Sequence, residues 1–241
     1  MLERISCIAL RTVKYNDRNS ILGVYTHSYG RLSLLLPAGT SRAAVRLRAL
    51  TMPLGRFECV ADIRPGRDIF AMRDVRPTGV PASTSPVKST LSLFTADLLA
   101  SLLREPQQDT ALFGFLWNTI DTLAEADQHL TANFHICLLM RLQQFLGIEP
   151  DWSTFSSGAV FDMADGIFRI TPPVHGRFLP SAEAEAAYTL RRISFRNASH
   201  FAMSRSDRNL ILDRLLQYYR IHFPSLGTLS SLDVLRAMFD F

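Results

Sequence analysis

Residues 20–36 read SILGVYTHSYGRLSLLL, two β-rich runs on either side of a tight turn. Tyr29-Gly30 marks the turn, because glycine adopts backbone conformations that other residues avoid. The flanking runs combine leucine with β-branched and aromatic residues, and the β-branched and aromatic types favour strands. We therefore predict two consecutive antiparallel strands in this segment.

Similar runs lie on both sides of these strands. Residues 5–13 precede them, separated by the polar turn 16–19. Residues 54–63 and 68–75 follow, joined by the turn signal Arg64-Pro65-Gly66-Arg67. Five short strands with a longer connection near residues 37–50 predict a five-stranded Greek-key barrel. The OB-fold is the commonest such barrel that binds oligonucleotides.

The pattern changes after residues 76–86, where three prolines stand among small polar residues. Apolar residues then recur at helical spacing, and the fold class predicted is α+β. We expect a barrel domain over residues 1–80 and a helical domain over residues 81–241. An irregular, turn-rich insertion is predicted at about residues 151–180. The predicted helices are residues 131–145, 181–192, 204–222 and 232–239, preceded by two between residues 91 and 123.

Charge is spread unevenly along the chain. Residues 1–80 hold 13 Lys and Arg against 6 Asp and Glu, a local net charge of +7, and the remainder holds 13 against 16, or −3. Nearly all the basic residues are arginine, which forks onto phosphate and stacks on bases. A basic first third favours a polyanionic partner, because binding follows the local field rather than the total charge.

Composition excludes several other classes of protein. The three cysteines, Cys7, Cys59 and Cys137, have no paired spacing, so we interpret them as buried thiols of a reducing compartment. No apolar run is long enough for a membrane span, and the first residues do not resemble a signal peptide. We expect a cytoplasmic protein; the association with the nucleoid is implied only by the family resemblance described below. No nucleophile elbow or phosphate-binding loop occurs in the sequence, so no enzymatic activity and no cofactor are predicted.

The order of several local strings resembles one protein family. Residues 8–15 (IALRTVKY) and 24–31 (VYTHSYGR) resemble the first three strands of RecO proteins. Residues 139–147 (LMRLQQFLG) resemble the helix that leads into the family's ribbon segment, and residues 218–224 (YYRIHFP) with 231–235 (SLDVL) resemble its last helices. No single string is specific, but their order and spacing agree from the first strand to the last helix.

The resemblance implies a recombination mediator in DNA repair. Such a protein binds and anneals single-stranded DNA, and helps to load the RecA recombinase onto strands covered by single-strand DNA-binding protein. The implied partners are single- and double-stranded DNA, RecR and the acidic C-terminal tail of single-strand DNA-binding protein. Many family members carry a four-cysteine zinc ribbon, but residues 155–166 contain no cysteine. We therefore predict a degenerate ribbon loop without zinc, because structural zinc needs four thiolate or imidazole ligands.

The candidate DNA contacts are arginines and one lysine of the predicted barrel. Residues 42–48 place three arginines after the flexible lead-in Pro37–Ser41, and we predict a mobile cationic loop there. A solvated loop without DNA contact is the alternative. The remaining candidates could extend the track across the barrel. The full set is Arg42, Arg46, Arg48, Arg11, Lys14, Arg18, Arg31 and Arg56.

Other candidates have stronger structural explanations. Tyr15, Tyr25, Tyr29 and Phe57 could stack on bases, but aromatic residues of strands usually pack inside. Asp151, Asp162 and Asp165 could imitate a metal site, but aspartate is also common in turns.

Partner binding is predicted in the helical domain. Arg104 and Arg141 are candidate rim residues of an apolar pocket for the acidic tail. An interaction scaffold with incidental DNA contact, and a nuclease that uses the acids of residues 151–165, are the alternative functions.

Overall fold

The structure is a computed structural model that describes residues 2–81 and 85–239. Ala82, Ser83 and Thr84 of the predicted linker lie outside the described residues, as do Met1 of the predicted barrel domain and residues 240–241 of the predicted helical domain. The chain forms two compact units: residues 1–126 with 228–241 form the first, and residues 127–227 the second. The domain division predicted at residue 80 stays a prediction.

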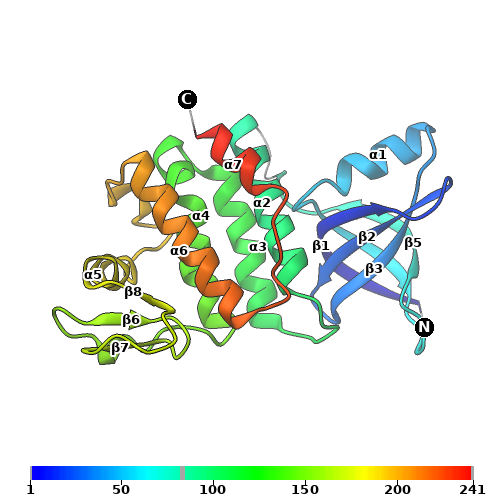
Figure 1. Cartoon of the computed structure of the whole chain (residues 1–241). Helices are drawn as coiled ribbons and strands as arrows, with labels where there is room; N and C mark the ends of the chain where they lie inside the picture. Colours follow the sequence, from blue (N-terminus) through cyan, green and yellow to red (C-terminus); the bar gives the residue numbers. More distant parts are fainter. Residues whose placement is uncertain (1, 82–84, 240–241) are drawn as a thin grey trace. The chain divides into compact units, whose positions relative to one another are not determined.

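The first unit begins with a closed five-stranded barrel (Figure 1). Its strand order is β1-β2-β3-β5-β4, with β1 paired to β4 and a short parallel pairing between β3 and β5. This is the arrangement of an OB-fold, and the α+β prediction is confirmed. The elements are β1 (Leu2–Lys14), β2 (Asn19–Thr26), β3 (Gly30–Pro37), α1 (Arg42–Leu50), β4 (Arg56–Asp62) and β5 (Phe70–Pro77).

The interior of the barrel follows strand alternation. Leu32, Leu34 and Leu36 of β3 point inward and are buried, whereas the residues between them are partly exposed. Cys7 and Cys59 are buried in the same interior, so their prediction as buried thiols is confirmed there. A β-bulge interrupts this alternation in β1 between Ala9 and Arg11.

Helices complete the first unit. They are α2 (Pro86–Leu102), α3 (Thr110–Glu125) and α7 (Leu232–Met238). Asp97 of α2 accepts hydrogen bonds from the amide and the hydroxyl of Ser231, at 3.2 and 2.9 Å, which ties α7 to α2. At the β2–β3 turn, Gly30 has a φ of +62°, and a Cβ atom there would lie 2.1 Å from the carbonyl oxygen of Gln107. Only glycine fits this turn.

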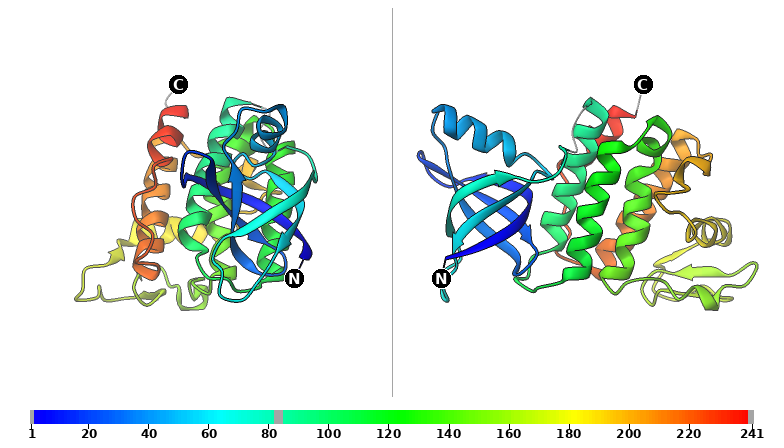
Figure 2. Two further views of the ribbon diagram at one scale, coloured as in Figure 1. Left: turned by 90° about the vertical axis from the view of Figure 1, so that its right-hand side faces the viewer. Right: turned by 180° about the vertical axis from the view of Figure 1, so that it is seen from behind.

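The second unit combines helices with a small sheet. Its helices are α4 (Gln128–Phe145), η1 (Trp152–Thr154), α5 (Ser181–Leu190), η2 (Ala198–His200) and α6 (Arg205–His222). The predicted turn-rich insertion holds a three-stranded sheet of order β7-β6-β8, formed by β6 (Val160–Asp162), β7 (Ile167–Arg169) and β8 (Phe178–Leu179) (Figure 2). Tyr219 of α6 donates a 2.7 Å hydrogen bond to the carbonyl oxygen of Leu139, which fixes α6 against α4.

The start of α6 shows how the sequence sets a helix boundary. The Ser204 hydroxyl accepts a hydrogen bond from the Asp207 amide, and the Asp207 carboxylate accepts one from the Ser204 amide. This reciprocal pair is the capping box that the sequence Ser204–Asp207 predicts. The prediction of a helix after Ser204 is confirmed.

Candidate functional site

The β1–β2 hairpin and α1 lie at the same end of the barrel (Figure 1). The pairing of β2 with β3 runs to Asn19 and Pro37, and the Ala38 amide then donates a 2.9 Å hydrogen bond to the carbonyl oxygen of Arg18. The turn of the hairpin therefore lies directly beside the lead-in to α1. Six exposed basic residues belong to these two segments. We call this part of the surface the basic end: Arg11, Lys14 and Arg18 of the hairpin, and Arg42, Arg46 and Arg48 of α1.

The segment predicted as a mobile cationic loop is a helix, so that prediction is wrong. Ser41 caps α1, because its hydroxyl accepts a 3.2 Å hydrogen bond from the Ala44 amide. Every residue of Arg42–Leu50 is arginine, alanine, leucine or valine, and most of these favour helix. Ala44 is buried and Leu47 packs on the barrel interior, which holds the helix in place.

The three arginines of α1 lie on different sides of the helix. Arg42 and Arg46 are one turn apart and therefore project from the same face. Arg48 turns back, and its Nη1 donates a 2.6 Å hydrogen bond to the carbonyl oxygen of Gly39. All three are exposed. The structure thus brings Arg42 and Arg46 together as one cationic face and uses Arg48 partly to hold the lead-in.

The hairpin adds Arg11, Lys14 and Arg18, all exposed. Lys14 lies 3.2 Å from the carboxylate of Asp17 on the surface. Such an exposed pair contributes little, so Lys14 can exchange it for a phosphate. The two segments of this end, residues 11–18 and 42–50, carry six basic residues and a single acid, Asp17. The local field of the basic end is therefore positive.

Arg31 lies flat on the barrel instead of projecting from it. A Cβ atom at Gly23 would meet the Arg31 guanidinium at 2.2 Å, so the absence of a side chain at Gly23 makes room for it. Burial lowers the pKa of Arg31 from its usual value. This half-buried position does not fit a contact with a phosphate backbone.

Arg56 is buried, which contradicts its prediction as a DNA contact. Its side chain is 1% exposed. Its guanidinium pairs with the carboxylate of Asp121 on α3, donates to the carbonyl oxygens of Val80 and Trp117 at 3.1 and 3.3 Å, and lies 4.8 Å from the centre of the Trp117 ring. The hydrogen bond from Arg56 lowers the pKa of Asp121. Arg56 joins β4 to α3 and is unavailable to a ligand.

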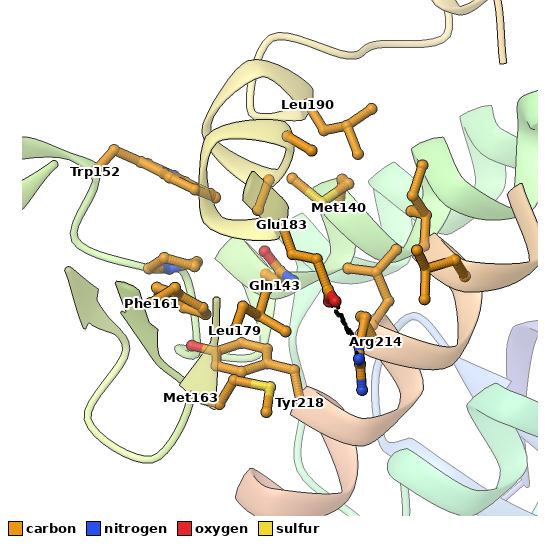
Figure 3. A pocket seen from close by; sticks show the side chains of 16 residues that line it. Met140, Gln143, Trp152, Phe161, Met163, Leu179, Glu183, Leu190, Arg214 and Tyr218 are labelled. Atoms are coloured by element: carbon orange, nitrogen blue, oxygen red, sulfur yellow. Dashed lines mark hydrogen bonds and ion pairs between the residues drawn. The ribbon is translucent and has the colours of Figure 1, made fainter. Parts of the chain in front are cut away.

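The second unit contains an apolar cavity of about 90 Å³ (Figure 3). Helices α4, α5 and α6 and the small sheet line it, through Met140, Phe161, Met163, Leu179, Leu190, Leu215 and Tyr218 among others. At its edge Arg214 forms a forked ion pair with Glu183, with nitrogen–oxygen distances of 2.6 and 3.1 Å. The cavity is therefore apolar inside with a charged pair at its margin.

The sequence prediction missed the arginine at this cavity. Arg104 is exposed just after α2 in the first unit, and Arg141 is half-buried on α4; neither lines the cavity. Arg214 does, and a signal was present in the sequence. Leu210, Arg214 and Tyr218 recur at four-residue spacing, which places an arginine within an apolar helix face.

Asp151 and Asp162, two of the three candidate aspartates, form turns as predicted, whereas the Asp165 carboxylate pairs with Arg169. Asp151 accepts the amide and hydroxyl of Ser153, and Asp162 accepts the amides of Ala164 and Asp165. Asp162 is buried, and burial opposes its ionisation. Hydrogen bonds from these two amides and from Arg169 outweigh that effect and lower its pKa.

His175 reaches Asp162 as well, at 3.3 Å, so one carboxylate ties together the turns of the small sheet. Across residues 2–81 and 85–239, no group of three or more His, Cys, Asp or Glu side chains is arranged to hold a metal ion. The absence of zinc stays a prediction.

The candidate aromatic residues separate by burial. Tyr25 and Phe57 are buried and Tyr29 is partly buried with its hydroxyl on Glu3, which confirms the packing interpretation for these three. Tyr15 is different, with 57% of its surface exposed.

Two family models match nearly the whole chain. The family described as Recombination protein O N terminal matches residues 1–80, and that described as Recombination protein O C terminal matches residues 83–231. The chain is 36% identical to DNA repair protein RecO of Phocaeicola vulgatus over 243 residues and 34% identical to that of Bacteroides fragilis over 245, with both chains fully covered. It is 35% identical to that of Porphyromonas gingivalis, with 97% of each chain covered. None of the described helices is long and apolar enough to cross a membrane.

Proposed function

Since this chain belongs to the RecO family of DNA repair proteins, we propose that it is a recombination mediator that binds and anneals single-stranded DNA. With RecR it helps to load the RecA recombinase onto strands covered by single-strand DNA-binding protein. The observation that carries this proposal is the basic end, where exposed arginines of α1 and of the hairpin meet with one acid among them. The proposed activity has no catalytic step. We expect the protein to act on DNA in the cytoplasm.

The basic end suits a phosphate backbone. Arg42 and Arg46 stand one turn apart on a capped helix, so both guanidinium groups can reach a strand that passes along α1. Arg11, Lys14 and Arg18 continue the positive surface onto the hairpin. Contacts of this kind position a strand without reading its sequence, which a mediator of repair at arbitrary sites requires. They also bind double-stranded DNA, which shares the same backbone.

The apolar cavity supports capture of a peptide tail. The C-terminal tail of single-strand DNA-binding protein is acidic and ends in phenylalanine, so it needs an apolar pocket with a cation at the margin. We propose that the terminal side chain enters the cavity and that Arg214 exchanges Glu183 for the peptide carboxylate. A cavity of about 90 Å³ is smaller than the ~150 Å³ that admits benzene, so Met140 and Met163, which are flexible, must move.

A strand-annealing assay tests the proposed function. Two complementary oligonucleotides are mixed with the protein, with and without single-strand DNA-binding protein, and duplex formation is followed over time. We expect acceleration in both cases, and the acceleration should fall steeply as salt rises. Annealing at the spontaneous rate, or a rate independent of salt, would contradict DNA mediation and favour the interaction scaffold.

Peptide binding tests the cavity separately from DNA. A tail peptide should bind the wild type and lose most of its affinity when its terminal phenylalanine is removed. Ala187→Leu on α5 should block binding by filling the cavity, whereas Ala182→Leu, on an exposed position of the same helix, should not. If Arg104→Ala and Arg141→Ala weaken binding while Arg214→Ala and Ala187→Leu leave it intact, the peptide binds elsewhere.

A further inference from the structure

The β1–β2 hairpin carries exposed apolar side chains among the cations of the basic end. Val13 is 53% exposed and Tyr15 57% exposed, whereas Val24 and Tyr25 of the neighbouring strand are buried. Arg11, Lys14 and Arg18 are exposed beside them. An aromatic side chain that is left in solvent within a cationic surface requires an explanation beyond folding.

The bulge in β1 places these side chains on the outside. Before it, Ala9 pairs with Val24 and both point into the barrel; after it, Arg11 pairs with Gly23, which lies on the outer face under Arg31. The extra residue therefore reverses the alternation of the strand. Arg11, Val13 and, by continued alternation, Tyr15 share the outer face of the hairpin. Without the bulge, Arg11 and Val13 would point inward.

The turn of the hairpin is well ordered by its own hydrogen bonds. The Asn16 side-chain oxygen accepts the amides of Arg18 and Asn19, at 3.0 and 2.8 Å. The amides of Tyr15 and Asn16 both donate to the carbonyl oxygen of Asn19, at 3.1 and 3.0 Å. Tyr15 is thus presented from a fixed turn, and little entropy is lost when a ligand packs on its ring.

We propose that the ring of Tyr15 stacks on an unpaired base of the bound strand, with Val13 packing beside it and Arg11 and Arg18 contacting the flanking phosphates. This proposal rests on the proposed function and deepens it. Stacking accepts any base because every base has a π-face, so it adds no sequence preference. A duplex keeps its bases stacked on one another and offers none to Tyr15. The hairpin therefore makes the basic end prefer single strands, which the arginines alone do not.

The test compares Tyr15→Ala, Tyr15→Phe and the wild type on single- and double-stranded oligonucleotides of equal length. Tyr15→Ala should weaken binding to the single strand about 5-fold or more, since base–aromatic stacking has that size. It should leave duplex affinity unchanged. It should also leave the slope of log affinity against log salt unchanged, because no charge is removed. Tyr15→Phe keeps the ring and should behave like the wild type.

A fluorescent base analogue in the single strand reports stacking directly. Its signal should change on binding the wild type and Tyr15→Phe, and not on binding Tyr15→Ala. Equal single-strand affinity of Tyr15→Ala and wild type, or an equal loss on both kinds of DNA, would overturn the stacking proposal alone. A wild type without salt-dependent DNA binding would overturn the proposed function, and the stacking proposal with it. Thermal melting of each variant confirms that the barrel is folded.

Discussion

Arginines of the same barrel have opposite environments. Arg42 and Arg46 project from α1 into solvent, whereas Arg56 is 1% exposed and bound to Asp121, two carbonyl oxygens and an aromatic face. A buried guanidinium needs such partners, because it cannot lose its charge. Local charge density therefore indicates that a protein binds a polyanion, but burial decides which cations take part.

The largest effect on stability is expected from replacing the buried Arg56. Arg56→Ala removes the partner of Asp121 and the hydrogen bonds that the guanidinium donates to the carbonyl oxygens of Val80 and Trp117, so we expect a loss of about 3 kcal/mol in the free energy of unfolding. Half-exposure of Asp121 keeps the value at the low end of that range. Chemical denaturation measures it, with Arg46→Ala as the exposed control, which should change stability by under about 0.5 kcal/mol. A loss of similar size in both variants would contradict the distinction.

Replacing the exposed arginines should weaken DNA binding and leave stability nearly unchanged. Replacing Arg42, Arg46 and Arg48 with alanine should weaken single-strand binding by roughly 100-fold near 0.1 M salt, because each contact contributes about 0.7 to the slope of log affinity against log salt. The slope should flatten by about two units if all three take part. Arg42→Ala with Arg46→Ala should account for most of the change, since Arg48 holds Gly39.

Binding isotherms at several salt concentrations measure these slopes. The loss should be similar for different base sequences. If the triple variant keeps its affinity and its slope, the strand follows another path, and Arg11, Lys14 and Arg18 become the principal candidates.

The sequence predicted the barrel, the change to helices and the cationic first third, because each depends on local pattern or composition. It did not place Arg56, whose partner Asp121 lies 65 residues further along the chain. It also did not predict the bulge that turns Arg11 outward, because one extra residue leaves no clear mark in an alternating strand. The error at Arg42–Leu50 was avoidable. Ser41 and the helix formers after it are a helix start signal, which the flexible lead-in before them obscured.

The second unit contains a buried histidine, which can lose its charge, whereas a buried arginine such as Arg56 cannot. His135 of α4 is 3% exposed, and burial, with a smaller effect from Arg208, lowers its pKa from 6.5 to about 3. The unfolded chain therefore takes up the proton first as the pH falls. The contribution of neutral His135 to the free energy of unfolding is fully present above pH 6.5. It decreases below that pH, by roughly 2.5 kcal/mol at pH 4.5.

His135→Leu should remove this part of the acid sensitivity while keeping the helix apolar. Unfolding free energies between pH 7 and 4.5 measure it. His129→Gln, an exposed position on the same helix, is the matched control and should keep the wild-type profile. An unchanged profile in His135→Leu would mean that other groups, such as Asp162, dominate acid unfolding.

The smallest expected effect concerns Arg31, whose burial is intermediate between that of the exposed Arg42 and Arg46 and that of the buried Arg56. Its guanidinium is half-buried over Gly23, so Arg31→Met should keep the packing of the stem and lower stability by about 1 kcal/mol or less. The DNA salt slope should change by under about 0.3, against about 0.7 for a true phosphate contact. Gly23→Ala is the complementary change. Its Cβ atom would displace the guanidinium into solvent, where Arg31 is free to reach a phosphate, and the slope should then steepen by up to about 0.7. A fall of about 0.7 in the slope of Arg31→Met would show instead that the wild-type guanidinium already contacts DNA, and that half-burial does not withdraw an arginine from the binding surface.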